Sequence, residues 1–202
     1  MPAAPALSLG EALNQVQQTS AAAVHQKLAK LLAPAKRAAP EEFAAELLGL
    51  LRHAFCVPKA RPGPAGGWAA PDPARQREPA VERLVRFLAA LASEAGGAAP
   101  DAEADAAFLE ELLWALLPLA AAADKIVRFR ACQAIAALLH GLGNDSELTG
   151  ALFEDLGTAM AVRLRDKNPA ARMQAARALA RLQVRRAAKT AFERADATAG
   201  PG

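Results

Sequence analysis

The chain has 202 residues, of which 53% are hydrophobic and only 4% aromatic, and its formal net charge is +3 at pH 7. This length allows one or two modest cores. The longest uninterrupted apolar run covers residues 112–123, which is too short to cross a bilayer, and the N-terminus lacks the charged-then-apolar pattern of a signal peptide.

Charge is distributed unevenly along the chain. Residues 1–124 contain 11 Lys or Arg against 14 Asp or Glu, whereas residues 125–194 contain 13 against 6. The C-terminal half is therefore the part that could face a polyanion such as nucleic acid.

Residues 1–56 are predicted to form N-terminal helices. Ser8 and Glu11 have capping-box spacing, so a helix is expected to start at Leu9 and to reach Leu32 with a break near Thr19. Pro34 is expected to stop it. A new helix is predicted from Pro40, which suits a first turn and is followed by two acidic residues.

A segment rich in proline and glycine follows, at residues 57–77, and predicts a disordered or extended loop. Trp68 stands alone inside it. It could anchor a partner, or it could fold back on nearby alanines.

Residues 78–183 are predicted to form paired helices, with an acidic break near residues 93–105. The expected helices run from Pro79 to Leu91, from Asp105 to a kink or end at Pro118, from an Asp124 cap to about Gly141, up to Leu164, and from Pro169 onward. After Gln183 the apolar pattern fades, so residues 184–202 are expected to be an irregular tail.

Two of these stretches repeat each other. Residues 124–139 read DKIVRFRACQAIAALL and residues 166–182 read DKNPAARMQAARALARL, with the Asp-Lys pairs 42 residues apart. A fainter third copy contains Arg83. A helical unit that recurs near forty residues predicts an all-α fold, an α-solenoid of HEAT-like helix pairs.

Arg130 and Arg172 occupy the same position in the two copies, six residues after Asp124 and Asp166. In stacked helical repeats such an arginine often donates to the turn aspartate of a neighbouring repeat, which aligns the stack. We expect these four residues to form a structural ladder.

Basic residues also crowd the predicted turn after residue 162: Arg163, Arg165 and Lys167. Arg75 and Arg77, which precede the Pro79 helix, could extend the same edge of the solenoid. Charges in a row suit a phosphate backbone without any base readout, although an ordinary solvated surface explains the spacing equally well.

The sequence contains no set of residues that is typical of an enzyme active site. His25, His53 and His140 have no metal-ligand spacing to each other or to Cys56 and Cys132, so no metal or cofactor is expected. A glycine-rich phosphate loop and a nucleophile elbow are also missing from the sequence. Both cysteines are expected to be free thiols.

Three blocks of the sequence resemble the N-terminal region of the condensin HEAT subunit family known as CAP-G. They read REPAVERLVRFL at residues 77–88, KIVRFRACQAIAALL at 125–139 and FEDLGTAMAVRLRDKNPAARMQAARALARLQ at 153–183. The blocks stand in the family's order, with an acidic insert between the first two. The resemblance covers most of residues 7–183 and is weaker before Arg77.

The resemblance implies a non-enzymatic part in mitotic chromosome condensation. It implies a kleisin partner (CAP-H), through it the SMC ATPase subunits, and duplex DNA held in a basic groove to which Arg75, Arg77 and the 163–167 turn would contribute. Gln76 replaces one basic residue of that pattern. The implied location is the nucleus and mitotic chromosomes, with the cytoplasm in interphase as an alternative, and no membrane is implied.

The family continues for many more repeats, so the sequence is expected to be a fragment whose last helix exposes an apolar face. The other reading is a generic HEAT-repeat scaffold that binds proteins and no nucleic acid.

Overall fold

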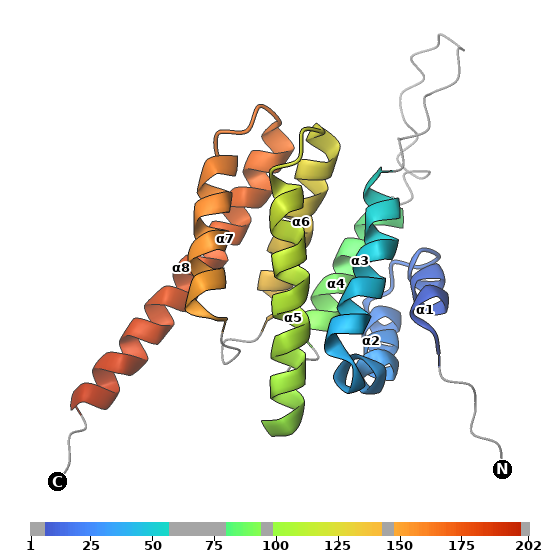
Figure 1. Cartoon of the computed structure of the whole chain (residues 1–202), viewed down its shortest axis with the longest axis horizontal. Coiled ribbons are helices and arrows are strands. Elements are labelled where there is room, and N and C mark those ends of the chain that lie inside the picture. The colour runs from blue at the N-terminus through green and yellow to red at the C-terminus, as the bar shows by residue number, and fades with distance from the viewer. Residues whose placement is uncertain (1–6, 57–79, 94–98, 143–147, 199–202) are drawn as a thin grey trace.

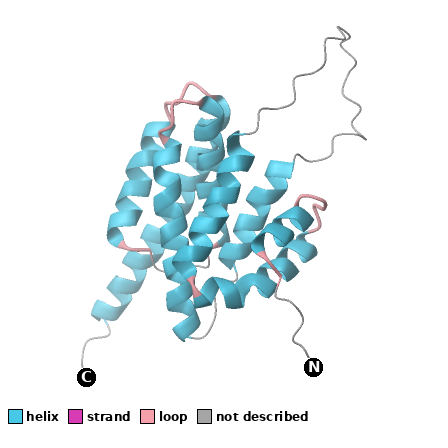
Figure 2. Ribbon diagram, turned by 45° about the vertical axis from the view of Figure 1, so that its right-hand side comes forward, coloured by secondary structure: helices cyan, strands magenta, loops and turns pink. Residues whose placement is uncertain are grey.

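The computed structural model describes residues 7–56, 80–93, 99–142 and 148–198, and within them the secondary structure is entirely helical (Figure 2). The helices in these ranges are α1 Leu9–Val16, α2 Ala22–Ala38, α3 Pro40–Cys56, α4 Ala80–Ser93, α5 Ala99–Ala120, α6 Lys125–Gly141, α7 Gly150–Arg163 and α8 Pro169–Thr198. The predicted loop at 57–77, with Trp68, lies outside the described residues.

Local signals start three of these helices where the sequence predicts. Ser8 accepts from the Glu11 N–H while the Glu11 carboxylate accepts from the Ser8 N–H, which completes a capping box at α1. Asp124 accepts from the Ile126 and Val127 N–H groups at the start of α6, and these bonds lower its pKa. α3 begins at Pro40 as expected.

Pro34 does not stop the second helix, contrary to the expectation. α2 runs through Pro34 to Ala38, because the turn beyond the proline is held by tertiary contacts. Lys36 is completely buried, and its Nζ lies 2.7 Å from Asp105 Oδ1 on α5. Arg37 donates from two nitrogens to the same carboxylate, at 3.2 to 3.4 Å. Two cations on one buried acid fix α2 against α5.

The acidic break is shorter than predicted. α5 begins at Ala99, so residues 99–105 are helical, as a proline in the first turn followed by acidic residues allows. Pro118 lies inside α5, which ends two residues later at Ala120.

The helices form two layers of HEAT-like pairs, which confirms the predicted solenoid. α3, α5 and α7 pack side by side and face the viewer in Figure 1, while α2, α4, α6 and α8 form the layer behind them. α1 packs on α2, α3 and α4 at the N-terminal end of the stack. The N-terminal helices therefore share one stack with the repeats.

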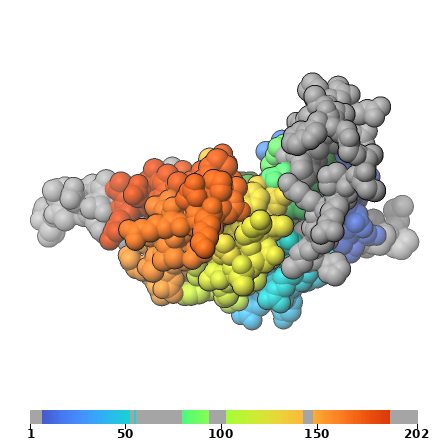
Figure 3. All heavy atoms as spheres, turned by 90° about the horizontal axis from the view of Figure 1, so that it is seen from above, coloured from blue at the N-terminus to red at the C-terminus, as the bar shows by residue number. Residues whose placement is uncertain are grey.

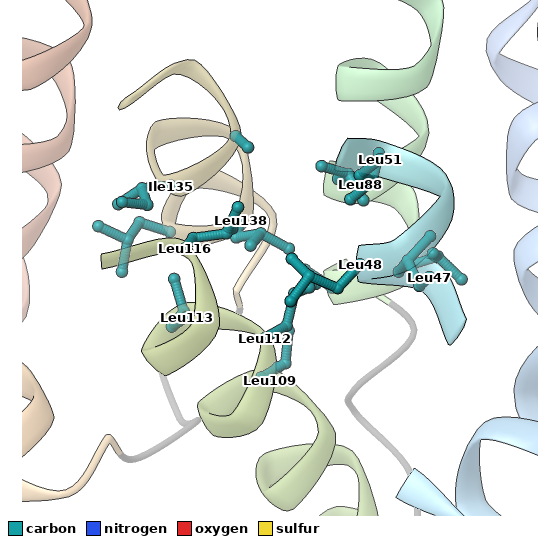
Figure 4. Close-up of a cluster of buried hydrophobic side chains, with 14 of the residues drawn as sticks. Leu47, Leu48, Leu51, Leu88, Leu109, Leu112, Leu113, Leu116, Ile135 and Leu138 are labelled. Atoms are coloured by element: carbon teal, nitrogen blue, oxygen red, sulfur yellow. The ribbon is translucent and has the colours of Figure 1, made fainter. Parts of the chain in front are cut away.

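Leucine and alanine fill the space between the layers. Figure 4 shows buried leucines of α5 beside Ile135 and Leu138 of α6 on one side and beside Leu48 of α3 on the other. Alanines of α6 and α8 such as Ala131, Ala134, Ala175 and Ala178 are fully buried. Their small side chains let the helices approach closely, which gives a thin helix-on-helix core.

The C-terminal segment is helical where an irregular tail was expected. α8 continues without interruption from Pro169 to Thr198. Residues 184–198 contain neither glycine nor proline and are rich in alanine and arginine, so intrinsic propensity extends the helix after the apolar pattern has faded. Among the helices described, none has the length and apolarity needed to span a membrane.

Candidate nucleic-acid interface at the turn edge

The turns within successive helix pairs lie at one edge of the stack. Residues 121–124 join α5 to α6, and residues 164–168 join α7 to α8. Figure 3 looks onto this edge, with the α7–α8 turn (orange) beside the α5–α6 turn (yellow). We call residues 121–125 and 164–168 together the turn edge.

The two turns have the same construction, in a register that differs from the predicted one. Arg128 Nη1 donates to the carbonyls of Ala122 and Ala123 at 2.9 and 2.7 Å. Arg172 Nη1 donates to the carbonyls of Asp166 and Lys167 at 2.8 and 3.4 Å. Arg128 and Arg172 are 44 residues apart, and so are the caps Asp124 and Asn168, which start α6 and α8. The matching Asp-Lys letters, 42 apart, are offset by two residues from the structural repeat.

The predicted ladder therefore has a different arginine. Arg128 reaches the turn aspartate of the next repeat, with Nε 2.8 Å from Asp166 Oδ2 and Nη2 3.2 Å from Oδ1. Arg130 points the other way along the stack and pairs at 2.5 Å with Glu82 on α4. Arg172 bonds the backbone of its own turn. The prediction that Arg130 and Arg172 bond turn aspartates is wrong. Aligning the two Asp-Lys pairs of the sequence shifts the repeat by two residues from the structural one.

Asp166 collects three donors although it is almost fully buried. Besides Arg128, it accepts from Arg163 Nη1 at 2.9 Å and from the Asn168 N–H at 2.9 Å. The hydrogen bond from Arg128 is the main cause that lowers the pKa of Asp166 to about 2, against the opposing effect of burial. The carboxylate thus stays ionised and locks the two turns together.

Exposed cations remain on this locked edge. The Lys125 carbonyl accepts from Asn168 Nδ2 at 3.4 Å, which brings the start of α6 next to the α7–α8 turn. The side chains of Lys125, Arg165 and Lys167 are exposed, and within the described residues none of them has a hydrogen-bond or ion-pair partner. These three cations form the part of the turn edge that can meet a phosphate backbone.

The other residues predicted to contact DNA are Arg163, Arg75 and Arg77. Arg163 is 21% exposed and its charge is offset by Asp166. Arg75 and Arg77 lie outside the described residues, in the connection between the end of α3 and the start of α4. Sequence reasoning missed Lys125, whose signal was its place directly after the Asp124 cap.

Several further cations are engaged inside the fold. Arg181 on α8 donates to the Leu139 and Leu142 carbonyls at the end of α6, at 3.2 and 3.1 Å. Lys36 Nζ lies 3.3 Å from the Leu91 carbonyl at the end of α4, and Arg83 on α4 donates to the Gln17 carbonyl at the end of α1. A count of basic residues therefore overstates the cationic surface.

Exposed apolar side chains lie within the turn edge and directly beside it. Ile126 is 41% exposed beside Lys125, and Leu164 is 42% exposed beside Arg165. The edge is thus a row of cations with aliphatic patches between them, a surface without the aromatic platforms that stack on unpaired bases.

The titratable candidates for other chemistry lie elsewhere. Cys132 is buried, and burial raises the pKa of its thiol to about 11, which suits an inert core residue. His25 Nε2 lies 3.0 Å from the Thr19 carbonyl, and the ring packs edge-on against Phe87. Within the described ranges, no three His, Cys, Asp or Glu side chains gather as a metal site would require. The side chains of His53 and Cys56 lie outside the description.

Comparisons with known proteins confirm the resemblance seen in the sequence. The chain is 36% identical over 111 residues to condensin complex subunit 3 of Homo sapiens, and 38% identical over 112 residues to the same subunit of Xenopus laevis. Each match covers 54% of this chain and 11% of the relative, so the chain spans about a tenth of the length of these proteins. No protein-family model matches the chain.

A solved structure shares the fold. The S. pombe condensin Cnd3-Cnd2 subcomplex contains a chain that superposes with a TM-score of 0.63 at 23% sequence identity. The match covers 87% of this chain and 19% of that one. The all-α solenoid is thus also found in a condensin subunit. At 23% sequence identity, this match supports a shared fold only.

Proposed function

Starting from the similarity to condensin complex subunit 3, we propose that this chain is part of a condensin HEAT subunit. In that role it scaffolds chromosome condensation and contacts duplex DNA through the turn edge. The observation that carries the proposal is the Arg128–Asp166 bridge, which holds two turns side by side with Lys125, Arg165 and Lys167 exposed on them. Exposed cations on two turns that are held side by side suit phosphates spaced along a duplex.

The proposed chemistry is binding without catalysis. The partners would be a kleisin subunit and, through it, the SMC ATPases that supply the energy of the complex. The structural neighbour is a two-subunit condensin assembly, which supports a kleisin-type partner for this chain as well. The proposed location is the nucleus and mitotic chromosomes.

Arg75 and Arg77 are proposed to add to the DNA contact, and Arg163 to support it. The connection that carries Arg75 and Arg77 starts where α3 ends and finishes where α4 begins, as the turns of the later pairs do. Those later turns lie at the turn edge. The two arginines are therefore proposed to contribute on the ground of their sequence position between α3 and α4.

The test is a binding measurement with a labelled duplex of about 30 base pairs at several salt concentrations. The triple variant Lys125→Glu, Arg165→Glu, Lys167→Glu should bind at least about tenfold more weakly at low salt, and its log–log salt slope should fall by about 3, because each phosphate contact contributes about 0.9. None of these side chains bonds within the described fold, so the variant should keep its helicity.

Arg186→Glu is the matched control for one charge reversal. Arg186 is exposed on α8, the helix that follows the turn edge, about 26 Å along it from Pro169 at the α-helical rise of 1.5 Å per residue. The proposal stands if three single reversals at the turn edge each weaken binding more than Arg186→Glu does. Equal effects at all four sites would mean general charge attraction, and an unchanged affinity in the triple variant would favour the protein-binding scaffold.

A further inference from the structure

The turn edge gathers positive charge at a place where helix stability disfavours it. Both α6 and α8 begin there, and neither helix has an acidic residue in its first turn. The N-terminus of a helix carries a partial positive charge, which favours acids and disfavours cations beside it. Lys125 is nevertheless the first residue of α6, and Arg165 and Lys167 lie just before α8. Helix stability therefore does not explain these cations, whereas attraction of an anion does.

Two carboxylates lie within the turn edge, and their surroundings differ. Asp124 is exposed and accepts from N–H groups at the start of α6. The side chain of Asp166 is 1% exposed and lies between the guanidiniums of Arg128 and Arg163. Because the cations of the edge repel one another, a buried opposite charge between the two turns favours their approach. Asp166 supplies that charge without covering the exposed cations.

The contacts of Asp166 connect one turn to the other. From α6, Arg128 donates to both carboxylate oxygens, at 2.8 and 3.2 Å. On its own turn, Asp166 Oδ1 accepts from the Asn168 N–H at 2.9 Å, and Asn168 Nδ2 donates to the Lys125 carbonyl at 3.4 Å. The two turns lie side by side in Figure 3. Removal of the carboxylate charge therefore weakens the connections that keep Lys125 beside the α7–α8 turn.

We infer that Asp166, although negatively charged, is a positioning residue for the proposed DNA contact. The inference rests on the proposed function and adds an acid to a site that binds a polyanion. Asp166 is buried, so it acts through the exposed cations and touches no phosphate. With the turns joined, Lys125 and the cations of the next turn meet the duplex as one preformed group. Without the connection, DNA binding has to order the turns, at a cost in conformational entropy.

Asp166→Asn separates positioning from general attraction, because the two predict changes of opposite sign. The substitution removes one negative charge, so general attraction alone would lower the Kd for DNA. Positioning predicts that Kd for the same labelled duplex rises at least about threefold at low salt, and that the log–log salt slope falls by about 1, as for one lost phosphate contact. Partial unfolding would not imitate this result, because it lowers the fraction of chains that bind and leaves the salt slope of the folded chains unchanged. Circular dichroism at the assay temperature gives the folded fraction.

Glu82→Gln is the matched control for the change in charge. Glu82 on α4 accepts from Arg130 and from Gln133 of α6, each at 2.5 Å, so it also joins neighbouring helices through an arginine. This bridge connects α6 to α4 and leaves the α7–α8 turn where it is. Glu82→Gln should therefore keep the salt slope of the parent, with Kd unchanged or lower.

A second pair of variants keeps the net charge constant. Arg128→Lys retains the charge but loses the two-point contact with Asp166, so it should raise Kd at least about threefold. Arg130→Lys is its control, two residues further along the same helix, and should bind DNA as the parent does.

The outcomes distinguish this inference from the proposed function. If Asp166→Asn binds as tightly as Glu82→Gln, or Arg128→Lys as tightly as Arg130→Lys, the inference is overturned and the proposed DNA contact stands. If the triple reversal of Lys125, Arg165 and Lys167 leaves the affinity unchanged, the proposed contact fails and the inference fails with it.

Discussion

Arg128 and Asp166 join consecutive helix pairs through a two-point contact, at 2.8 and 3.2 Å, although they are 38 residues apart in sequence. The carboxylate is 1% exposed and the guanidinium 15%. Because Arg163 shares the same carboxylate, Asp166 is the acceptor on which both arginines depend.

Asp166→Asn should lower the free energy of unfolding by about 2–3 kcal/mol, since it removes the charge that two half-buried guanidiniums face. Denaturant titration followed by circular dichroism measures the loss. Asp155→Asn is the matched control on exposed surface of α7, and it should change stability by less than about 0.5 kcal/mol. Equal losses in the two variants would contradict a special role for Asp166.

The same carboxylate makes part of the stability depend on pH. The pKa of Asp166 is lowered from 3.8 to about 2, so its ionisation stabilises the fold above about pH 4, and this contribution is lost as the pH falls toward 2. Because solvent near the turn screens the charges, the ionised Asp166 contributes about 1–2 kcal/mol to the free energy of unfolding. The stability gap between the parent and Asp166→Asn should therefore narrow between pH 5 and pH 2.5, as denaturation series at stepped pH would reveal. A gap that stays constant across this range would mean that ionisation is irrelevant.

Two glycines should respond to alanine in opposite directions. A Cβ on Gly141 would lie 2.3 Å from the Ala89 carbonyl oxygen, so Gly141→Ala should force α4 and α6 apart and cost about 1–3 kcal/mol. Gly157 lies inside α7 with nothing within 4 Å of an added Cβ, so Gly157→Ala should stabilise the chain by about 0.5–1 kcal/mol. Thermal midpoints of the two variants test the pair, and a stabilised Gly141→Ala would show that the helices do not meet there.

The buried cluster of Lys36, Arg37 and Asp105 predicts an order of effects. Asp105→Leu should cost about 3–5 kcal/mol, because it leaves Lys36 buried without its carboxylate. Lys36→Met should cost less, since Arg37 still bonds Asp105. The double variant Lys36→Met, Asp105→Leu should be more stable than Asp105→Leu alone, measured by the same titration. If the double variant were the least stable of the three, the two charges would not be coupled.

Sequence reasoning found the features that depend on nearby residues. The capping box at Ser8, the Asp124 cap and the proline at the start of α3 act within one turn, so their letters are sufficient. The stacked helix pairs follow from apolar periodicity in the same way. The similarity to a condensin subunit was visible in three short blocks.

What it missed depends on contacts between distant segments. From the sequence alone, Pro34 is expected to end the helix. The structure shows that Asp105 holds Lys36 and Arg37 in the helical turn after this proline. In the sequence, Arg130 and Arg172 stand at matching positions after the Asp-Lys pairs, so Arg130 was predicted to be the ladder arginine. In the structure, Arg128 is the residue that is equivalent to Arg172, because both bond the backbone of their own turn. The candidate site changed accordingly: Lys125 entered it, and Arg163 became an internal partner of Asp166.

The carbonyls at the ends of α1, α4 and α6 receive their donors from Arg83, Lys36 and Arg181, each of which belongs to another helix. Consequently these three helix ends depend on a neighbouring helix, and melting that neighbour uncovers polar backbone at the end that it caps. Amide protons near residues 139–142 should then exchange with the same protection as those of α8 around Arg181, so that heating or stretching releases neighbouring pairs as one block.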